Sequence, residues 1–176
     1  MHPLQDPQQH DDLLNYRLKR LLALGGAPAI RLCEGRFGVS RLEWRLVAAL
    51  VESGACSPSA LAERAHVELP RVSRTLRRLI GKELVERCAA DTDARRFVVA
   101  ASASGETLYR ALWPELAAIN RRVASVLSAE EAVVLDRCLA KLTAQAQQLQ
   151  DEGGGVDVRT ERRLGGSRRF WSEALD

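Results

Sequence analysis

The stretch that begins at Ser57 constrains the fold most, because it predicts two short helices followed by two β-strands. Ser57 suits a helix N-cap, and Pro58 suits the first helical position, where a missing N–H costs nothing. This first helix extends to about residue 65, and a turn separates it from a second helix at 69–82. Four apolar residues recur at helical spacing in the second helix, so one of its faces is predicted to be buried. They are Val72, Leu76, Leu79 and Ile80.

The opposite face of the second helix is basic. It carries Pro70, Arg71, Arg74, Arg77 and Arg78, and Arg74 projects most directly away from the apolar stripe. A helix of this width and charge can enter the major groove of DNA and contact base edges and phosphates. A solvated surface helix is the alternative, but charged faces of that kind usually alternate in sign. The pattern therefore favours nucleic-acid binding.

Two strand-like runs follow the basic helix, at 84–89 and 96–101, and a polar link joins them. The composition of this link is typical of a hairpin tip. Helix, turn, basic helix and hairpin together are the pattern of a winged helix-turn-helix, in which the hairpin is the wing. At its tip, Arg95 could enter a narrow minor groove, where the negative potential attracts a guanidinium, and Asp93 could hold the tip in place.

The positive charge is concentrated in this region. The chain of 176 residues has a formal net charge of only +3, whereas residues 68–82 hold five Lys or Arg and one acid. A local basic patch is typical of a nucleic-acid reader. No apolar run approaches the roughly 20 residues of a membrane span, and the N-terminus lacks the pattern of a signal peptide, so we expect a cytoplasmic protein without a membrane partner.

Cysteine and histidine spacing does not predict a metal site. The four cysteines are scattered without a C-x-x-C pair, and the three histidines lie far apart in the sequence. We therefore expect no metal and no other cofactor. Common hydrolase, phosphate-binding, dinucleotide-binding and metalloprotease motifs are absent from the sequence, so an enzyme is not expected. A redox-sensing thiol at Cys33 or Cys88 stays an alternative, because one thiol of low pKa is enough.

Apolar helices flank the predicted head on both sides. Leucines form a stripe at 11–24, an S-x-x-E capping box opens a helix at Ser40, and further stripes lie at 105–126 and 128–142. Gly25–Pro28 predicts a kink or break, and a short strand near Cys56 could pair with the wing. A head of about 70 residues does not need so many apolar helices. We therefore expect a homodimer, which would suit a palindromic DNA site.

The chain resembles the MarR family of regulators over about residues 11–149. The matching segments are Phe37–Ser40 with Glu43–Arg45, 57–65, 72–79, 84–87 and 93–105. The last segment is the strongest match, because it looks like the D-x-R wing of the family followed by a strand and a helix start. The resemblance implies a mainly α fold with a small two- to three-stranded β-wing. It implies a DNA-reading head at 36–102, dimerisation helices at 11–35 and 103–149, and a peripheral tail at 150–176.

The resemblance also implies a transcription factor, usually a repressor, that leaves double-stranded operator DNA when a small aromatic or phenolic acid binds. Two residues depart from the family pattern. Glu83 stands where the family often has Gly, and Pro70 stands where a small hydroxyl residue often contacts phosphate.

Two sets of candidate site residues follow. Those for DNA contact are Pro70, Arg71, Ser73, Arg74, Arg77, Arg78, Asp93, Arg95 and Arg96. Those for an aromatic effector are Trp44, Tyr109 and Trp113, with Arg17, Arg20, Arg31 or Arg45 as partner of a carboxylate. The aromatic residues could instead be simple core, and Arg78 could instead pair with Glu83 or Glu86. Besides the ligand-responsive repressor, a thiol-switched repressor and a protein-binding winged helix stay open.

Overall fold

The computed structural model describes residues 2–90 and 93–152, and the side chains at 89–96 lie outside what it describes. Its described part is mainly α with one two-stranded sheet, which confirms the predicted fold class. The chain divides into two compact units, 1–125 and 126–176. The first holds a 3-10 turn at His10–Asp12, α1 (Leu14–Arg36), α2 (Arg41–Ser53), α3 (Pro58–Ala65), α4 (Leu69–Gly81), β1 (Val85–Ala90), β2 (Asp93–Ala101) and α5 (Ala103–Ala124), and the second holds α6 (Ala129–Asp151).

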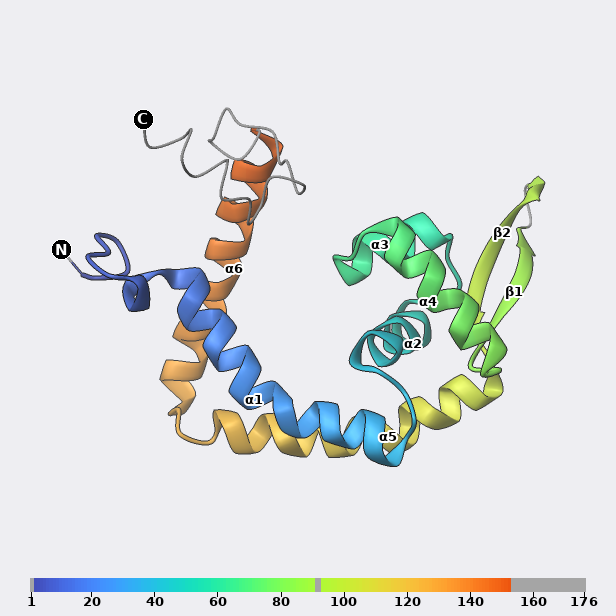
Figure 1. The fold of residues 1–176 in the computed structure, drawn as a ribbon, viewed down its shortest axis with the longest axis horizontal. Helices are drawn as coiled ribbons and strands as arrows, with labels where there is room; N and C mark the ends of the chain where they lie inside the picture. Colours follow the sequence, from blue (N-terminus) through green and yellow to red (C-terminus); the bar gives the residue numbers. More distant parts are fainter. Residues whose placement is uncertain (1, 91–92, 153–176) are drawn as a thin grey trace, which may run out of the picture. The chain divides into compact units, whose positions relative to one another are not determined.

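Within the first unit, α2, α3, α4 and the β1–β2 hairpin form the head, and α1 runs alongside α5 (Figure 1). The sequence signals at the start of α3 act as predicted, because the Ser57 hydroxyl accepts a hydrogen bond from the N–H of Ala60 at 3.2 Å. His66 ends α3 in the left-handed region at φ +48°, and this sharp turn starts the path to α4. The helix-turn-helix is therefore built from local signals.

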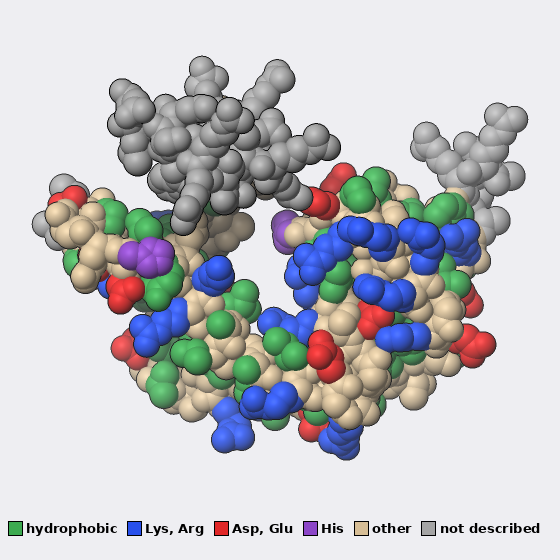
Figure 2. Space-filling model, in the orientation of Figure 1, with side chains coloured by type: hydrophobic (Ala, Val, Ile, Leu, Met, Phe, Trp, Pro, Cys, Tyr) green, Lys and Arg blue, Asp and Glu red, His purple; other side chains and the backbone are tan. Residues whose placement is uncertain are grey.

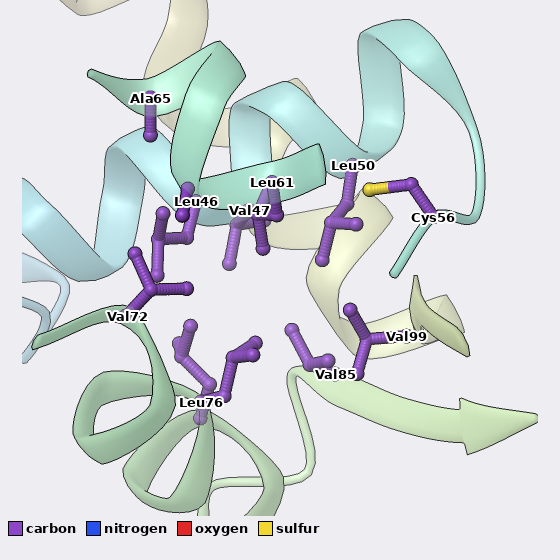
Figure 3. Packing of buried hydrophobic residues seen from close by; sticks show 12 residues of the cluster. Leu46, Val47, Leu50, Cys56, Leu61, Ala65, Val72, Leu76, Val85 and Val99 are labelled. Atoms are coloured by element: carbon purple, nitrogen blue, oxygen red, sulfur yellow. The ribbon is translucent and has the colours of Figure 1, made fainter. Parts of the chain in front are cut away.

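The core of the head lies where α2, α3, α4 and the sheet meet (Figure 3). Leu46 and Val47 from α2 are fully buried, as is Leu61 from α3. The predicted stripe of α4 supplies Val72, Leu76 and Leu79, and Ile80 is partly buried beside it. Val85 and Val99 close the core from the two strands. Each such side chain contributes about 1.5–3 kcal/mol to folding by leaving water, so this cluster fixes how α4 sits in the head.

The sheet pairs β1 with β2 antiparallel, with Arg87 opposite Val99 and Ala89 opposite Phe97. The predicted short strand near Cys56 is confirmed as a single bridge, in which Cys56 and Val99 exchange backbone hydrogen bonds of 3.1 and 2.9 Å. Glu83 precedes β1 at φ +58°, in the conformation that favours glycine. Glu83 therefore adopts a backbone conformation to which glycine is better suited.

Of the kink or break predicted at Gly25–Pro28, the break is wrong, because α1 continues through this segment to Arg36. Proline removes one helix hydrogen bond, but packing against another helix can offset that loss. Here α1 packs against α5. A Cβ added at Gly25 would make an ordinary contact of 3.8 Å with Val123 of α5, whereas one added at Gly26 would lie only 2.7 Å from Nη1 of Arg41. The pattern of prolines and glycines alone could not show this tertiary support.

A second, smaller core connects the head to the flanking helices. Cys33 of α1, Trp44 of α2 and Leu112 of α5 are buried together with Val39 from the loop between α1 and α2. The backbone N–H of Val39 donates to the carbonyl of Cys33 at 3.0 Å. The start of α2 is thus packed against both flanking helices of the first unit.

The N-terminus of α2 is joined to the C-terminus of α4 through one buried carboxylate. Glu43, 3 % exposed, completes the predicted capping box by accepting the N–H of Ser40 at 2.7 Å. It also pairs with Lys82 at 3.0 Å and with Arg78 at 3.7 Å, and Lys82 donates to the carbonyl of Gly38 at 2.8 Å. Burial by itself raises the pKa of Glu43, but the hydrogen bonds from Ser40 and Lys82 outweigh it and hold the pKa below its usual range.

We expect Glu43→Gln to lower the free energy of unfolding by about 1–3 kcal/mol at pH 7, because it keeps the cap but removes the charge that pairs with Lys82. A lowered carboxyl pKa stabilises the fold above the unfolded pKa of about 4.3 and loses that contribution as pH falls through the folded pKa. The difference between wild type and variant should therefore be constant near neutrality and shrink below about pH 4 in urea titrations.

Glu131→Gln is the matched control, because Ser128 and Glu131 form the same capping box at an exposed site on α6. It should change stability by less than about 0.5 kcal/mol. An equal loss in both variants, or a Glu43→Gln loss that persists unchanged in acid, would contradict the role assigned to the buried charge.

Candidate nucleic-acid interface

Helix α4 presents a basic face on the side away from the core. Val72, Thr75, Leu76 and Leu79 are buried, whereas the four arginines of the helix are exposed. Figure 2 shows Lys and Arg side chains gathered over this part of the head. The arrangement follows from the helical period, because the apolar and basic residues fall on opposite sides at about 100° per residue.

The four arginines differ in what they contact. Within the described part of the chain, no carboxylate pairs with the guanidinium of Arg71, Arg74 or Arg77. Arg78 pairs with Glu43 at 3.7 Å and donates to the hydroxyl of Thr75 at 3.4 Å. Its partner is thus neither Glu83 nor Glu86, because Glu43 is brought to it from a distant part of the sequence. Three guanidiniums are available for a ligand, and the fourth is engaged in the fold.

The remaining predicted residues of α4 lie beside these arginines. Pro70 is exposed in the first turn, and Ser73 is half-buried and lines a hollow together with Arg77. Pro70 has no N–H to donate, so any contact it makes with DNA is through its ring. Asp93, Arg95 and Arg96 belong to β2, but their side chains lie outside the described residues.

Arg45, predicted as an effector partner, contacts helix α3 within the head. Its guanidinium donates to the backbone carbonyl of Ala65, at the C-terminus of α3. The last carbonyls of a helix lack partners within the helix, so a cation there completes their hydrogen bonding and interacts well with the helix dipole. Arg45 therefore holds α3 against α2, a role that sequence spacing did not indicate.

The three aromatic candidates for an effector site form one ladder. The rings of Trp44 and Tyr109 stack with centroids 5.4 Å apart, and those of Tyr109 and Trp113 with centroids 6.0 Å apart. The Tyr109 hydroxyl donates a hydrogen bond to Glu52 at 2.8 Å. The pKa of Tyr109 is raised, chiefly because the side chain is partly buried and also because the Glu52 carboxylate lies beside it. The sequence predicted that these three aromatic residues lie together with an arginine. The charged group that contacts the ladder is the Glu52 carboxylate.

The predicted arginine partners lie in other surroundings. Arg17 pairs with Asp12 at 3.6 Å. Arg20 lines a shallow hollow along α1 with Tyr16, and Arg31 lines another with Arg122. These positions separate the cations from the aromatic ladder.

An arginine that sequence reasoning missed lies at a groove between α1 and α5. The groove has a volume of about 270 Å³ and is lined largely by leucines, glycines and other apolar residues, with Arg41 and Asn120 at its wall. The guanidinium of Arg41 lies so close to Gly26 that a Cβ there would be 2.7 Å from Nη1. The sequence signal is weak, because Arg41 looks like an ordinary first-turn residue of α2.

A second missed arginine is Arg87 of β1, whose guanidinium lies over the ring of Phe97 at 4.6 Å from its centroid. Arg87 is two residues from the buried Val85, so strand alternation places both side chains on one face of the sheet. This alternation could have identified Arg87 from the sequence.

The two thiols proposed for a redox switch, those of Cys33 and Cys88, differ in their burial. Cys33 is buried, and burial raises its pKa, which lowers the thiolate fraction on which reactivity depends. Cys88 is half-buried, and both are free thiols. Within the described residues no group of three or more His, Cys, Asp and Glu side chains is placed to hold a metal, and no helix is long and apolar enough to cross a membrane.

Comparison with known proteins agrees with the resemblance seen in the sequence. The family model for the MarR family matches residues 37–96. A curated relative, the HTH-type transcriptional regulator FarR of Neisseria gonorrhoeae, is 30 % identical over 100 residues, which cover 57 % of this chain and 68 % of the relative.

Solved structures share the fold. BpsR of Bordetella bronchiseptica, whose DNA binding is regulated by 6-hydroxynicotinic acid, matches with a TM-score of 0.69 at 20 % identity, over 78 % of this chain and 97 % of its own. A mutant MarR from E. coli, complexed with operator DNA, matches with a TM-score of 0.61 at 21 % identity, over 72 % of this chain and 93 % of its own. The family match and the curated relative agree with the winged head and its basic helix α4. The chain therefore belongs to the MarR family and is a DNA-binding transcriptional regulator.

Proposed function

We propose that this regulator is a homodimeric repressor that binds a palindromic operator. Helix α4 enters the major groove, the hairpin tip reaches the adjacent minor groove, and a small organic acid releases the DNA. Residues 36–102 act as the reading head, and 11–35 and 103–149 act in dimerisation. A cytoplasmic location follows from the DNA target.

The observation that carries this proposal is the acid-free arginine face of α4. Arg71, Arg74 and Arg77 are exposed on a helix whose other face is anchored in the core. Cations grouped without acids repel each other, and the phosphates and guanine edges of DNA are the partners that would relieve this repulsion. We assign base reading to Arg74 and phosphate contacts to Arg71 and Arg77. Arg95 and Arg96 would act at the wing, with Asp93 holding the tip.

Dimerisation is supported by exposed apolar side chains on α1 and on α6. Leu21, Leu22 and Leu24 of α1 are 57–69 % exposed. In the second unit, α6 has no buried residue, and Leu135, Leu139 and Leu142 lie 40–44 % exposed along it. Exposed apolar helices of this kind mark interaction surfaces, and a second copy of the chain is the partner that a palindromic site requires.

The effector proposal combines an aromatic acid with the α1–α5 groove. The groove offers apolar walls and one guanidinium, Arg41, which suits a small apolar acid. Trp44 lies one turn after Arg41 on α2, and its ring starts the aromatic ladder. Glu52 would repel an anion at the ladder itself, so we place the carboxylate on Arg41. Regulation of BpsR by 6-hydroxynicotinic acid, an aromatic acid, supports this class of effector.

We expect Arg74→Ala to weaken operator binding by about 1–3 kcal/mol and to relax the preference at one position of each half-site. Arg78→Ala is the matched control, because this arginine lies on the same helix but pairs with Glu43. It should leave the sequence preference unchanged. Selection of bound duplexes from random DNA with each variant measures this, and an unchanged preference in Arg74→Ala would refute base reading by Arg74.

We expect Leu139→Glu to convert the dimer to a monomer, because it places a charge in an apolar stripe within an interface on the order of 2,000 Å². Lys141→Glu, two residues away on the same exposed helix, should leave the dimer intact. Light scattering at micromolar concentration gives the mass of each. A monomeric wild type, or equal behaviour of the two variants, would rule out this interface.

We expect Arg41→Ala to retain operator binding but to lose most of its response to aromatic acids, because the carboxylate loses its cation. The free energy of coupling between effector and DNA should fall from about 1–3 kcal/mol towards zero. Operator affinity with and without a panel of aromatic acids measures this, with tryptophan fluorescence as the binding readout. Arg110→Ala, an exposed arginine on α5, should respond like wild type. A full response in Arg41→Ala would move the effector away from this groove.

A further inference from the structure

A hollow of about 250 Å³ lies between α4 and the two strands of the hairpin. Ser73 and Arg77 of α4 line one side, Arg87 and Phe97 of the strands line the other, and Leu76 and Val99 lie between them. We call it the wing hollow. It is continuous with the head core, because Leu76 and Val99 are core residues.

The register of the hairpin explains why a cation points into this hollow. Val85, Arg87, Phe97 and Val99 share one face of the sheet, since Arg87 pairs with Val99 and Phe97 pairs with Ala89. The valines of this face are buried in the core, and Arg87 and Phe97 continue the same face towards the tip. Arg87 therefore faces α4 and not the outer side of the wing.

The side chains of the hollow are arranged for an anion. The Arg87 guanidinium lies 4.6 Å from the centroid of the Phe97 ring, which is 42 % exposed. Within the residues that the structure describes, no carboxylate pairs with Arg87 or with Arg77. Two cations that face one hollow repel each other, and an anion between them would turn this repulsion into attraction. A guanidinium held over an aromatic ring in this way still has its N–H groups free to donate.

We propose that the wing hollow clasps one sugar–phosphate strand of the DNA, with Arg87 as its phosphate ligand and Phe97 as the residue that positions Arg87. This inference rests on the proposed placement of α4 and the hairpin tip in adjacent grooves. A major groove and its neighbouring minor groove are separated by one backbone strand. A head that fills both grooves therefore carries that strand across the space between α4 and the hairpin, where the hollow lies.

The first test compares Arg87→Ala, Arg87→Lys and the control Arg110→Ala on the selected operator. Loss of one phosphate contact should weaken binding roughly tenfold in Arg87→Ala and reduce the log–log salt slope by about 0.9. The base preference should not change, because phosphates carry no direct sequence information. Arg87→Lys should keep the salt slope and lose only about threefold in affinity, because the charge remains but the planar stacking is lost. Arg110→Ala should match wild type.

Phe97→Leu tests the positioning role, since it keeps an apolar side chain but removes the ring face. It should weaken binding by about two- to fivefold in the wild-type background. In the Arg87→Ala background the same change should have no effect, because nothing remains to be positioned. Independent effects in this double-mutant cycle would contradict a positioning role for Phe97.

In a second test the change is made in the DNA, so its first arm uses only the wild-type protein. Neutral methylphosphonate groups replace single phosphates along the operator, one position at a time. Wild type should lose roughly tenfold in affinity at a phosphate between the half-site major groove and its flanking minor groove, and Arg87→Ala should be insensitive at that same phosphate.

The outcomes separate this inference from the proposed function. If Arg74→Ala loses its base preference while Arg87→Ala keeps the wild-type affinity, salt slope and methylphosphonate pattern, the clasp is wrong and the placement of α4 stands. If both variants bind like wild type, the proposed DNA-binding mode fails as a whole. A changed base preference in Arg87→Ala would also overturn the clasp, because it would make Arg87 a base reader.

Discussion

One buried carboxylate joins the basic helix α4 to the rest of the head. Glu43 caps α2 and at the same time holds Lys82 and Arg78 at the end of α4. A buried charge is costly unless it is paired and hydrogen-bonded, and here every oxygen has a partner. The same cluster holds the loop before α2 through the carbonyl of Gly38. The basic helix is therefore attached to the scaffold by directional contacts at its C-terminal end, in addition to its apolar stripe.

This attachment divides the arginines of α4 by role. One guanidinium is used to fix the helix, and three others remain without acidic partners among the described residues. A helix that is already fixed in the head loses little further backbone freedom on binding a ligand, which would favour recognition in the proposed binding mode. Arg87 extends this principle to the wing, where an aromatic ring restrains the cation.

The second core connects the same head to α1 and α5. Its buried side chains are Cys33, Trp44, Leu112 and Val39. Val39 lies directly before α2, the helix that Glu43 caps. The aromatic ladder continues from Trp44 to Tyr109 and Trp113 along α5. Closely packed side chains thus connect α1 and α5 to α2, and α2 carries the carboxylate that holds α4. Such contiguity is the physical route by which a ligand at the α1–α5 groove would act on the head.

The sequence by itself determined the local elements and the basic face of α4. Caps at Ser40 and Ser57 and the helical period of the Val72 stripe depend on neighbours in the chain, so they can be read directly. Tertiary structure decided which charges are free, because Arg78 and Arg45 are engaged by Glu43 and Ala65 from distant segments. It also decided that α1 continues through Pro28, since packing on α5 supports a helix that local propensity would break. Partners far apart in sequence are set by the fold, and no local pattern encodes them.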